Sequence, residues 1–157
     1  MADAPSDDPH DLRRFAIAQA DDYDRALAEI RDGRKRSHWM WYIFPQFAGL
    51  GLSSTSRLYA IKSLAEARAY LDHPTLGPRL VACANALMKV EARSASTIFG
   101  SPDDLKLKSS ATLFAAVAPD DSVFARVLDK YFGGDRDDRT LELIGETSGE
   151  DRGRAHP

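Results

Sequence analysis

The chain has few of the residues from which covalent cross-links and metal sites are built. Cys83 is its only cysteine, so no internal disulfide can form, and this fits a reducing compartment. Histidine is scarce as well, so we expect no metal and no cofactor. No run of about 18 apolar residues could span a bilayer, and residues 1–9 are acidic and polar rather than a basic segment leading into an apolar one. We therefore expect a cytoplasmic protein that does not bind a membrane.

The chain also lacks a strong excess of charge of either sign. Its net charge of −3 weighs against nonspecific nucleic-acid binding, because such binding needs a positive field that displaces the counterions of the phosphate backbone. With 43% hydrophobic and 29% charged residues, the composition excludes fibrous and wholly disordered classes. Its 157 residues suffice for one buried core and are too few for two ordinary domains. The sequence thus predicts one soluble globular domain.

The two ends of the chain differ in composition from its body. Residues 1–9 and 147–157 are polar and rich in Asp, Gly, Pro and Ser, and they cannot bury enough apolar surface to offset their ordering entropy. We expect both to be disordered tails. Residues 10–146 contain no repeat and no linker long enough to divide them, so they are predicted to form the single ordered domain.

Apolar residues recur through the body at the 3.6-residue period of helices that bury one face. Leu12, Phe15 and Ala16 begin this pattern, and Gln19 takes the next inward place, so a polar group should face the core or a cavity. Further helices are expected over 23–30, 63–73, 76–88, 102–119 with a break near Lys108, 123–131 and 141–144. Because no segment alternates with a period of two, the predicted fold class is all-α, a compact, bundle-like domain of short helices.

Boundary signals support these ranges. Ser63 and Glu66 have the spacing of a capping box, in which each side chain satisfies a backbone donor at the start of a helix. Gly33 follows an apolar face at a point where a left-handed residue ends a helix at least cost. Pro102 is expected in the first turn of its helix, where its missing N–H costs nothing.

Residues 37–47 are the most unusual segment, because both tryptophans and several other aromatic side chains crowd into it. The run is apolar on all sides, so we expect it to be buried on all sides, as a helix ended by Pro45 or as an extended piece. One interpretation makes it the heart of the core, since aromatic side chains dominate core energetics. The other interpretation is that part of it recognises a ligand.

The ligand interpretation rests on the polar residues in and around the run. The basic stretch 34–36 could neutralise phosphates, the indoles and Tyr42 could stack on a base, and His38 lies beside both. This combination suits a nucleotide-like ligand. The candidate catalytic residue of this segment is His38, and the candidate ligand-binding residues are Arg36, Trp39, Trp41, Tyr42 and Gln46.

Two further segments carry polar groups that a site could use. Residues 49–55 could wrap an anion, but a Gly-x-Gly without a preceding strand is a weak signal, so a surface loop is favoured. Residues 103–114 mix acids, lysines and hydroxyls with apolar residues, so they form either a solvated helix face or part of a cleft. The candidates here are Asp104 for catalysis and Lys106, Ser109, Ser110 and Thr112 for ligand binding.

These segments together resemble a known family over nearly the whole body. The opening at 11–15, the hallmark at 33–35, 37–46 and 49–51, and the later match at 103–107, 109–110 and 112–114 are similar to the bacterial family named domain of unknown function 1810, or DUF 1810. The resemblance implies an all-helical fold. Some members are labelled calpastatin, but calpastatin segments are disordered until they bind their target, whereas this chain has a packed-core pattern. We therefore do not expect that activity.

The sequence favours one function and leaves a second open. The favoured function is a small-ligand domain that binds a nucleotide or an ADP-ribose-like molecule between 34–46 and 103–112, and an analogy with helical ADP-ribose-processing proteins suggests the same ligand class. If the protein is an enzyme, His38 or Asp104 would move a proton, as in hydrolysis of an N-glycosidic bond. The alternative is a protein-interaction module that uses the aromatic 38–47 segment to bind a partner.

Overall fold

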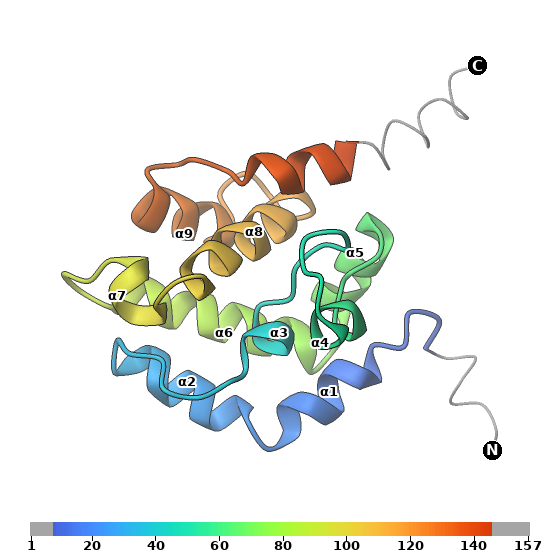
Figure 1. The fold of residues 1–157 in the computed structure, drawn as a ribbon, viewed down its shortest axis with the longest axis horizontal. Coiled ribbons are helices and arrows are strands. Elements are labelled where there is room, and N and C mark those ends of the chain that lie inside the picture. Colours follow the sequence, from blue (N-terminus) through green and yellow to red (C-terminus); the bar gives the residue numbers. More distant parts are fainter. Residues whose placement is uncertain (1–7, 146–157) are drawn as a thin grey trace.

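The computed structural model describes residues 8–145 of the chain (Figure 1). Its helices are α1 (Arg13–Ala20), α2 (Tyr23–Arg31), α3 (Met40–Ile43), α4 (Ser54–Leu58), α5 (Leu64–Asp72), α6 (Leu76–Lys89), α7 (Ala95–Phe99), α8 (Asp103–Ala116) and α9 (Val123–Phe132). Residues 138–145 form one more helical segment. The tails expected at 1–9 and 147–157 lie outside the described residues, apart from Asp8 and Pro9.

The helices are arranged around α6, which crosses the centre of the molecule with α1 and α2 on one side and α8 and α9 on the other (Figure 1). Helix α6 packs on α2, α5 and α9, and α8 packs on α9. The described part of the chain contains no strand, only an isolated bridge between Phe47 and Ile61. The predicted all-α fold is therefore confirmed. No helix within residues 8–145 has the length and apolarity needed to cross a membrane.

The helices are short and are stabilised by a shared apolar core. The longest, α6 and α8, have 14 residues each, a length at which an isolated helix is marginal in water. Cys83 lies on the buried stripe of α6, and burial raises the pKa of its thiol to about 12, so it behaves as a small apolar residue. The largest fully buried side chains include Trp39, Tyr70, Phe15, Phe114 and Ile30.

Gln19 is the polar side chain that the sequence places on an inward face, and it is 1% exposed. Its amide nitrogen donates hydrogen bonds to the carbonyl oxygen of Tyr42 at 2.7 Å and to the hydroxyl of Tyr70 at 2.9 Å. Arg79 donates to its side-chain oxygen at 3.4 Å. The buried amide is therefore paired, and it joins α1 to α3, α5 and α6.

Serine side chains begin several of the helices. In the predicted capping box, the backbone amide of Glu66 donates to the hydroxyl of Ser63 at 3.0 Å, so the helix start is confirmed. The carboxylate of Glu66 accepts from the amide of Lys62 at 2.9 Å rather than from that of Ser63, which corrects the second half of the prediction. The serines whose hydroxyls accept from the backbone amide three residues further on are Ser53, Ser63, Ser94 and Ser122.

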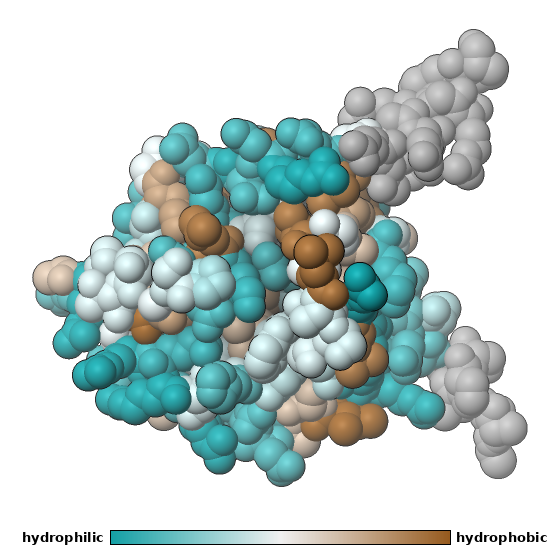
Figure 2. All heavy atoms as spheres, in the orientation of Figure 1, coloured by the Kyte–Doolittle hydropathy of each residue, from teal (hydrophilic) through white to brown (hydrophobic). Residues whose placement is uncertain are grey.

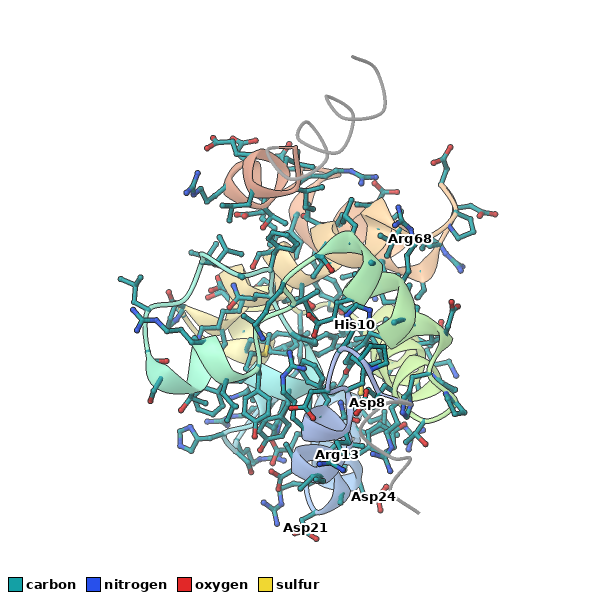
Figure 3. The ribbon with its side chains drawn as sticks, turned by 90° about the vertical axis from the view of Figure 1, so that its right-hand side faces the viewer. Asp8, His10, Arg13, Asp21, Asp24 and Arg68 are labelled. Carbon is teal, nitrogen blue, oxygen red and sulfur yellow. The ribbon has the colours of Figure 1, made fainter. Side chains whose placement is uncertain are left out.

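Asp8 fixes the start of α1, although the sequence assigns it to a tail. Its two carboxylate oxygens accept hydrogen bonds from the amides of Leu12 at 2.7 Å and Arg13 at 3.1 Å. Figure 3 shows Asp8 and Arg13 side by side at this end of the helix. A carboxylate is stabilising there because the first amides of a helix have no partner within it. Asp8 therefore contacts the start of α1 in the described structure.

Helix α8 differs from the prediction at its start and in its middle. It begins at Asp103, so Pro102 lies just before the helix rather than in its first turn. It also continues past Lys108, where the sequence predicts a break. The lysine does not interrupt the buried face, because Leu107 and Ala111 point into the core while the ammonium of Lys108 lies 6.0 Å from a ring centre on α9.

The aromatic segment 37–47 is held by one buried carboxylate, that of Glu29, which is 5% exposed. Its Oε1 accepts from the amides of Arg36 at 2.8 Å and Ser37 at 3.0 Å and from the indole nitrogen of Trp39 at 2.9 Å. Its Oε2 accepts from the hydroxyl of Ser37 at 2.6 Å. Burial raises the pKa of Glu29, but the hydrogen bonds together outweigh burial and lower the pKa from 4.5 to about 2.

The aromatic segment is not buried on all sides, which corrects the prediction. Helix α3 spans only four residues, and its inward face consists of Met40 and Ile43, which are both 2% exposed. Trp41 and Tyr42 lie on the other face of this turn and are half-buried, and His38 is exposed. The spacing of three places the two buried residues on one side of the helix and leaves the two between them on the other.

Two buried hydroxyls of α8 differ in their hydrogen bonding. Thr112 donates to the carbonyl oxygen of Lys108 at 2.8 Å and accepts from the amide of Asp137 at 2.9 Å, which ties the chain before the segment 138–145 to α8. Ser110 is 1% exposed, and its hydroxyl has no hydrogen-bond partner within the described residues. A buried hydroxyl without a partner costs about 1–3 kcal/mol of stability.

The replacement Glu29→Gln should remove a pH-dependent part of the stability. A carboxylate whose pKa is lowered by folding stabilises the protein fully above its unfolded pKa of 4.5 and loses that contribution as the pH falls through about 2. The difference in unfolding free energy between wild type and Glu29→Gln should include roughly 3 kcal/mol from this pKa difference at about pH 7 and should shrink below about pH 5. Urea unfolding at several pH values measures this difference. A constant difference down to about pH 3 would contradict the assignment.

The replacement Ser110→Ala should leave the stability unchanged or raise it by up to about 1 kcal/mol, because it removes a polar group that lacks a partner. Thr112→Val, a matched change in the same helix, should lower the stability by about 1–3 kcal/mol, because it leaves the amide of Asp137 without its acceptor. Chemical denaturation of both variants gives the comparison. A larger loss for Ser110→Ala than for Thr112→Val would show that the Ser110 hydroxyl is satisfied.

Candidate functional site

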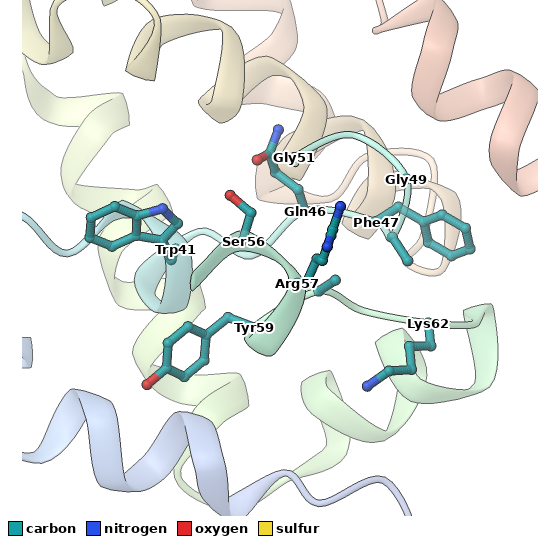
Figure 4. Close-up of a pocket in the computed structure, with 11 residues that line it drawn as sticks. Trp41, Gln46, Phe47, Gly49, Gly51, Ser56, Arg57, Tyr59 and Lys62 are labelled. Carbon is teal, nitrogen blue, oxygen red and sulfur yellow. The ribbon is translucent and has the colours of Figure 1, made fainter. Parts of the chain in front are cut away.

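The candidate site is a pocket of about 280 Å³ formed by residues between α3 and α5 (Figure 4). Trp41 and Gln46 line it, and both are ligand-binding candidates from the sequence. Arg57 and Lys62 also line it, and in Figure 4 Trp41 and Lys62 lie on opposite sides with Arg57 between them. All of the described lining residues fall within 41–62, so one continuous stretch of chain folds around the cavity.

Two aromatic rings form part of the pocket wall. Tyr59 is held by ring contacts with Phe15 at 5.8 Å and with Tyr42 at 5.2 Å between centroids, so α1 and α3 fix its position. Trp41 is half-buried, and the ammonium of Lys106 lies 5.6 Å from its ring centre. Because Lys106 does not line the pocket, this cation supports the indole from outside the cavity.

Arg57 and Lys62 supply the charge of the pocket. Both side chains are exposed, and no ion pair within residues 8–145 includes either of them. No carboxylate is present among the described residues that line the cavity. The pocket therefore presents two cations without an acidic partner, an arrangement that attracts anions.

A buried ion pair fixes the chain that carries these cations. Arg14 on α1 donates from Nε to the carbonyl oxygen of Leu58 at 2.8 Å and from Nη2 to that of Ala60 at 2.9 Å. The same Nη2 donates to Oε2 of Glu66 at 2.8 Å, and only 9% of the Arg14 side chain and 3% of the Glu66 side chain are exposed. Oε1 of Glu66 accepts from the amide of Lys62. The pair thus holds both ends of the segment 58–62.

The glycine-rich loop forms another wall of the pocket. A Cβ atom at Gly51 would lie 2.4 Å from the Cβ of Ser56 on α4, so only glycine allows this approach. Gly49 has a φ of +103°, and a Cβ there would lie 3.3 Å from the side chain of Leu143 in the segment 138–145. The sequence favours a plain surface loop here, and that interpretation is incomplete because both glycines line the cavity.

The segments 34–46 and 103–112 meet in space, but they do not form the pocket between them. The amide nitrogen of Gln46 donates to the hydroxyl of Ser109 at 2.6 Å, and the ammonium of Lys35 lies 2.9 Å from Oδ2 of Asp103. No residue of 103–112 lines the cavity. Lys106 therefore lies outside this pocket, where its ammonium contacts the Trp41 ring and Asp103, and Ser109 contacts the pocket residue Gln46.

Three predicted ligand-binding residues lie in the core. Trp39 and Thr112 are 0% exposed and Ser110 is 1% exposed, so none of these side chains offers a surface to a ligand. The indole nitrogen of Trp39 donates to Glu29, and the hydroxyl of Thr112 is paired within the fold. These burials replace the predicted ligand contacts with structural roles.

Four other predicted residues lie outside the pocket lining. Arg36 is exposed and pairs at 3.3 Å with an aspartate at the end of α2, and the hydroxyl of Tyr42 donates to Asp22. Asp104 accepts from the next amide of α8 at 2.9 Å, at the start of that helix. His38 is exposed. The candidate catalytic residues His38 and Asp104 therefore do not line this pocket.

Arg57, Tyr59 and Lys62 are the site residues that the sequence interpretation missed. They lie in a stretch without a helical stripe or a recognisable motif. One signal could have drawn attention to it, since Arg57 and Lys62 follow a glycine- and serine-rich loop and no acid separates them from that loop. Loops of that composition, held close to a scaffold, often carry binding residues.

Comparison with known proteins places the chain in a family. A family model described as protein of unknown function (DUF1810) matches residues 9–144. The chain belongs to this family. The crystal structure of the conserved hypothetical protein Rv1873 from Mycobacterium tuberculosis is similar to this DUF1810 protein at 51% sequence identity and a TM-score of 0.86, and the match covers 87% of this chain and 98% of that one. No curated protein matches it. The predicted family and fold are thus confirmed.

In this DUF1810 protein, Gly51→Ala should distort the pocket wall and Ser56→Gly should relieve the distortion. The added methyl group overlaps the side chain of Ser56, so the single change should lower the unfolding free energy by about 1–3 kcal/mol. Ser56→Gly alone should cost about 1 kcal/mol, because glycine disfavours a helix. The double variant should lose less than the sum of the two by at least about 0.5 kcal/mol. Additive losses in a urea double-mutant cycle would rule out the contact.

Proposed function

We propose that this DUF1810 protein binds a small anionic ligand that carries an aromatic ring, of the nucleotide type, in the pocket formed by residues 41–62. The supporting observation is the lining itself, in which, within residues 8–145, Arg57 and Lys62 have no acidic partner and no carboxylate is present. Arginine and lysine bind phosphate through charge-assisted hydrogen bonds. Trp41 and Tyr59 supply rings on which a base can stack.

Two polar side chains can orient such a ligand. The side-chain nitrogen of Gln46 donates to the hydroxyl of Ser109, and this leaves the side-chain oxygen of Gln46 to accept a hydrogen bond from a ligand. The hydroxyl of Ser56 accepts from that of Ser53 at 2.9 Å, so its own proton can be donated. An acceptor and a donor in one pocket match the edge of a base, which also carries both kinds of group.

The size of the pocket limits the ligand. Its volume of about 280 Å³ lies at the lower end of the range for small-molecule sites, which is roughly 300–1,000 Å³. A nucleoside monophosphate suits this volume better than an ADP-ribose-like molecule, which would extend beyond the rim. The proposal therefore narrows the ligand class expected from the sequence to its smaller members.

We propose ligand binding only, and we do not propose that the pocket catalyses a reaction. Proton transfer in hydrolysis is most often carried out by histidine or by a carboxylate. Among the described residues that line the pocket there is neither. His38 and Asp104 lie outside the lining, so they have no role in this proposal.

We also place the protein in the cytoplasm of a bacterium. Support for the source comes from the similar structure, which is from Mycobacterium tuberculosis. The location is supported by Cys83, a free and buried thiol, because a chain without disulfides suits a reducing compartment.

A second candidate function is docking of another protein at the rim of the pocket. Leu52 is 79% exposed and Leu58 is 55% exposed, and they belong to the loop and the helix that line the cavity. Figure 2 shows the apolar side chains of this face as separate patches among polar ones. Separate patches fit ordinary monomer surfaces better than a large docking site, so ligand binding is the favoured function.

AMP should raise the melting temperature of the purified protein, since a ligand at about 100 times its Kd stabilises the folded state by roughly 2.7 kcal/mol. Arg57→Gln and Lys62→Gln should each weaken binding about tenfold or more, because each removes a charge-assisted contact. Trp41→Leu should remove a stacking contact worth about 1–3 kcal/mol. Thermal-shift assays identify the ligand, and calorimetric titration gives the affinities.

Arg126→Gln is the matched control, because Arg126 is an exposed cation of α9 that does not line the pocket. This variant should bind AMP as the wild type does. NAD and ADP-ribose, tested alongside, should bind more weakly than AMP, as the pocket volume requires. If none of these ligands changes the melting temperature, the ligand proposal fails. Partner capture that is lost in Leu58→Ser would then support docking at the rim.

A further inference from the structure

A second cavity, also of about 280 Å³, lies between α2 and α6 and shares no lining residue with the candidate pocket. Arg31 lines it from the last turn of α2, and Asn85 and Lys89 line it from α6. A spacing of four places Asn85 and Lys89 on one face of their helix. The small side chains of Ala82 and Ala86 keep the space between the helices open. Two cationic side chains and one amide from two helices thus converge on one cavity.

The two cations of this cavity have no acidic partner. Arg31 and Lys89 are exposed, no carboxylate is among the lining residues, and no ion pair within residues 8–145 includes either cation. Two basic residues that follow α2 in the sequence are paired, since Arg36 lies 3.3 Å and Lys35 lies 2.9 Å from an aspartate oxygen. The positive charge at the cavity is therefore uncompensated within the described chain.

The helix ends do not account for these cations. Arg31 and Lys89 lie in last turns, where a cation can offset the helix dipole and bond to free carbonyl groups. At the end of α6 this role is already filled by Lys130, whose ammonium donates to the carbonyl oxygens of residues 87, 88 and 90 at 3.2, 2.8 and 2.5 Å. At the end of α2 the carbonyl groups of 28–30 accept from the backbone amides that follow. The carbonyl groups at these two helix ends are thus satisfied without Arg31 and Lys89.

We propose that this cavity binds a phosphate group, either as the free anion or as a monoester. The guanidinium of Arg31 can donate two parallel hydrogen bonds to two phosphate oxygens, Lys89 adds a compact positive charge, and the amide of Asn85 adds a neutral donor. No aromatic side chain is among the described residues that line the cavity, so recognition is confined to the anionic group. The inference is independent of the proposed nucleotide pocket, because the two cavities are built from different residues.

Titration of inorganic phosphate into the ¹⁵N-labelled full-length protein tests this proposal by NMR. The side-chain signals of Asn85 and the backbone signals around Arg31 and Lys89 should shift and saturate. Arg31→Gln and Lys89→Gln should each weaken binding about tenfold or more, and Lys89→Arg should retain it. Ala82→Leu, which fills the cavity without a change of charge, should also abolish binding. Sodium chloride at matched ionic strength controls for general screening.

Arg57→Gln changes only the candidate pocket, so it should leave the phosphate-induced shifts around Asn85 unchanged. This variant therefore distinguishes a failure of the phosphate proposal from a failure of the nucleotide proposal. Glycerol 3-phosphate distinguishes the two sources of the anion. Binding as tight as that of inorganic phosphate assigns the site to monoesters, and much weaker binding assigns it to the free anion. The proposal is overturned if signals around Asn85 do not move, or if they move equally in the Arg31→Gln/Lys89→Gln double variant.

Discussion

The buried pair of Arg14 and Glu66 is the constraint on which the candidate pocket depends. Only 9% and 3% of these side chains are exposed, so either charge alone would be left in a poorly solvated place at a cost of several kcal/mol. Arg14 directs its donors to the chain between α4 and α5, and Glu66 accepts from the amide of Lys62 in the same segment. The pair thereby joins α1 to α5 through a stretch that belongs to no strand and whose backbone is otherwise tied mainly by the isolated bridge of Ile61 to Phe47. A rigid pocket at such a stretch requires this kind of support.

A second buried carboxylate supports the opposite side of the site by the same physical means. Glu29 on α2 accepts from two backbone amides, a hydroxyl and the indole of Trp39, and so it fixes the chain that enters α3. The position of this chain sets the rotation of α3 about its own axis. Met40 therefore faces the core and Trp41 lines the pocket. In both cases a helix presents a carboxylate that accepts from the amides of irregular backbone, and Glu66 is in addition paired with the charged side chain of Arg14.

The fold could be predicted from the sequence because its signals are local. The inward place of Gln19 and the cap at Ser63 follow from spacings of three or four residues, and the structure confirms both. The pocket could not be predicted in the same way, because the contact between Arg14 and Glu66 joins positions that no local pattern relates. Aromatic content could not separate Trp39 from Trp41 either. Their different burial depends on the hydrogen bonds of a glutamate that precedes the aromatic segment and lies in another helix.

The net charge of −3 also conceals how the charges are placed. The two buried glutamates are occupied by backbone amides and by Arg14, so they do not neutralise the cations at the surface hollows. Arg57 and Lys62 remain at one cavity and Arg31 and Lys89 at the other, and no carboxylate of the described chain lines either one. The local field in a concave site, rather than the total charge, determines which ions concentrate there. The two proposed sites are therefore compatible with a mildly acidic net charge. Only the first cavity adds aromatic rings, so only that one suits a ligand with a base.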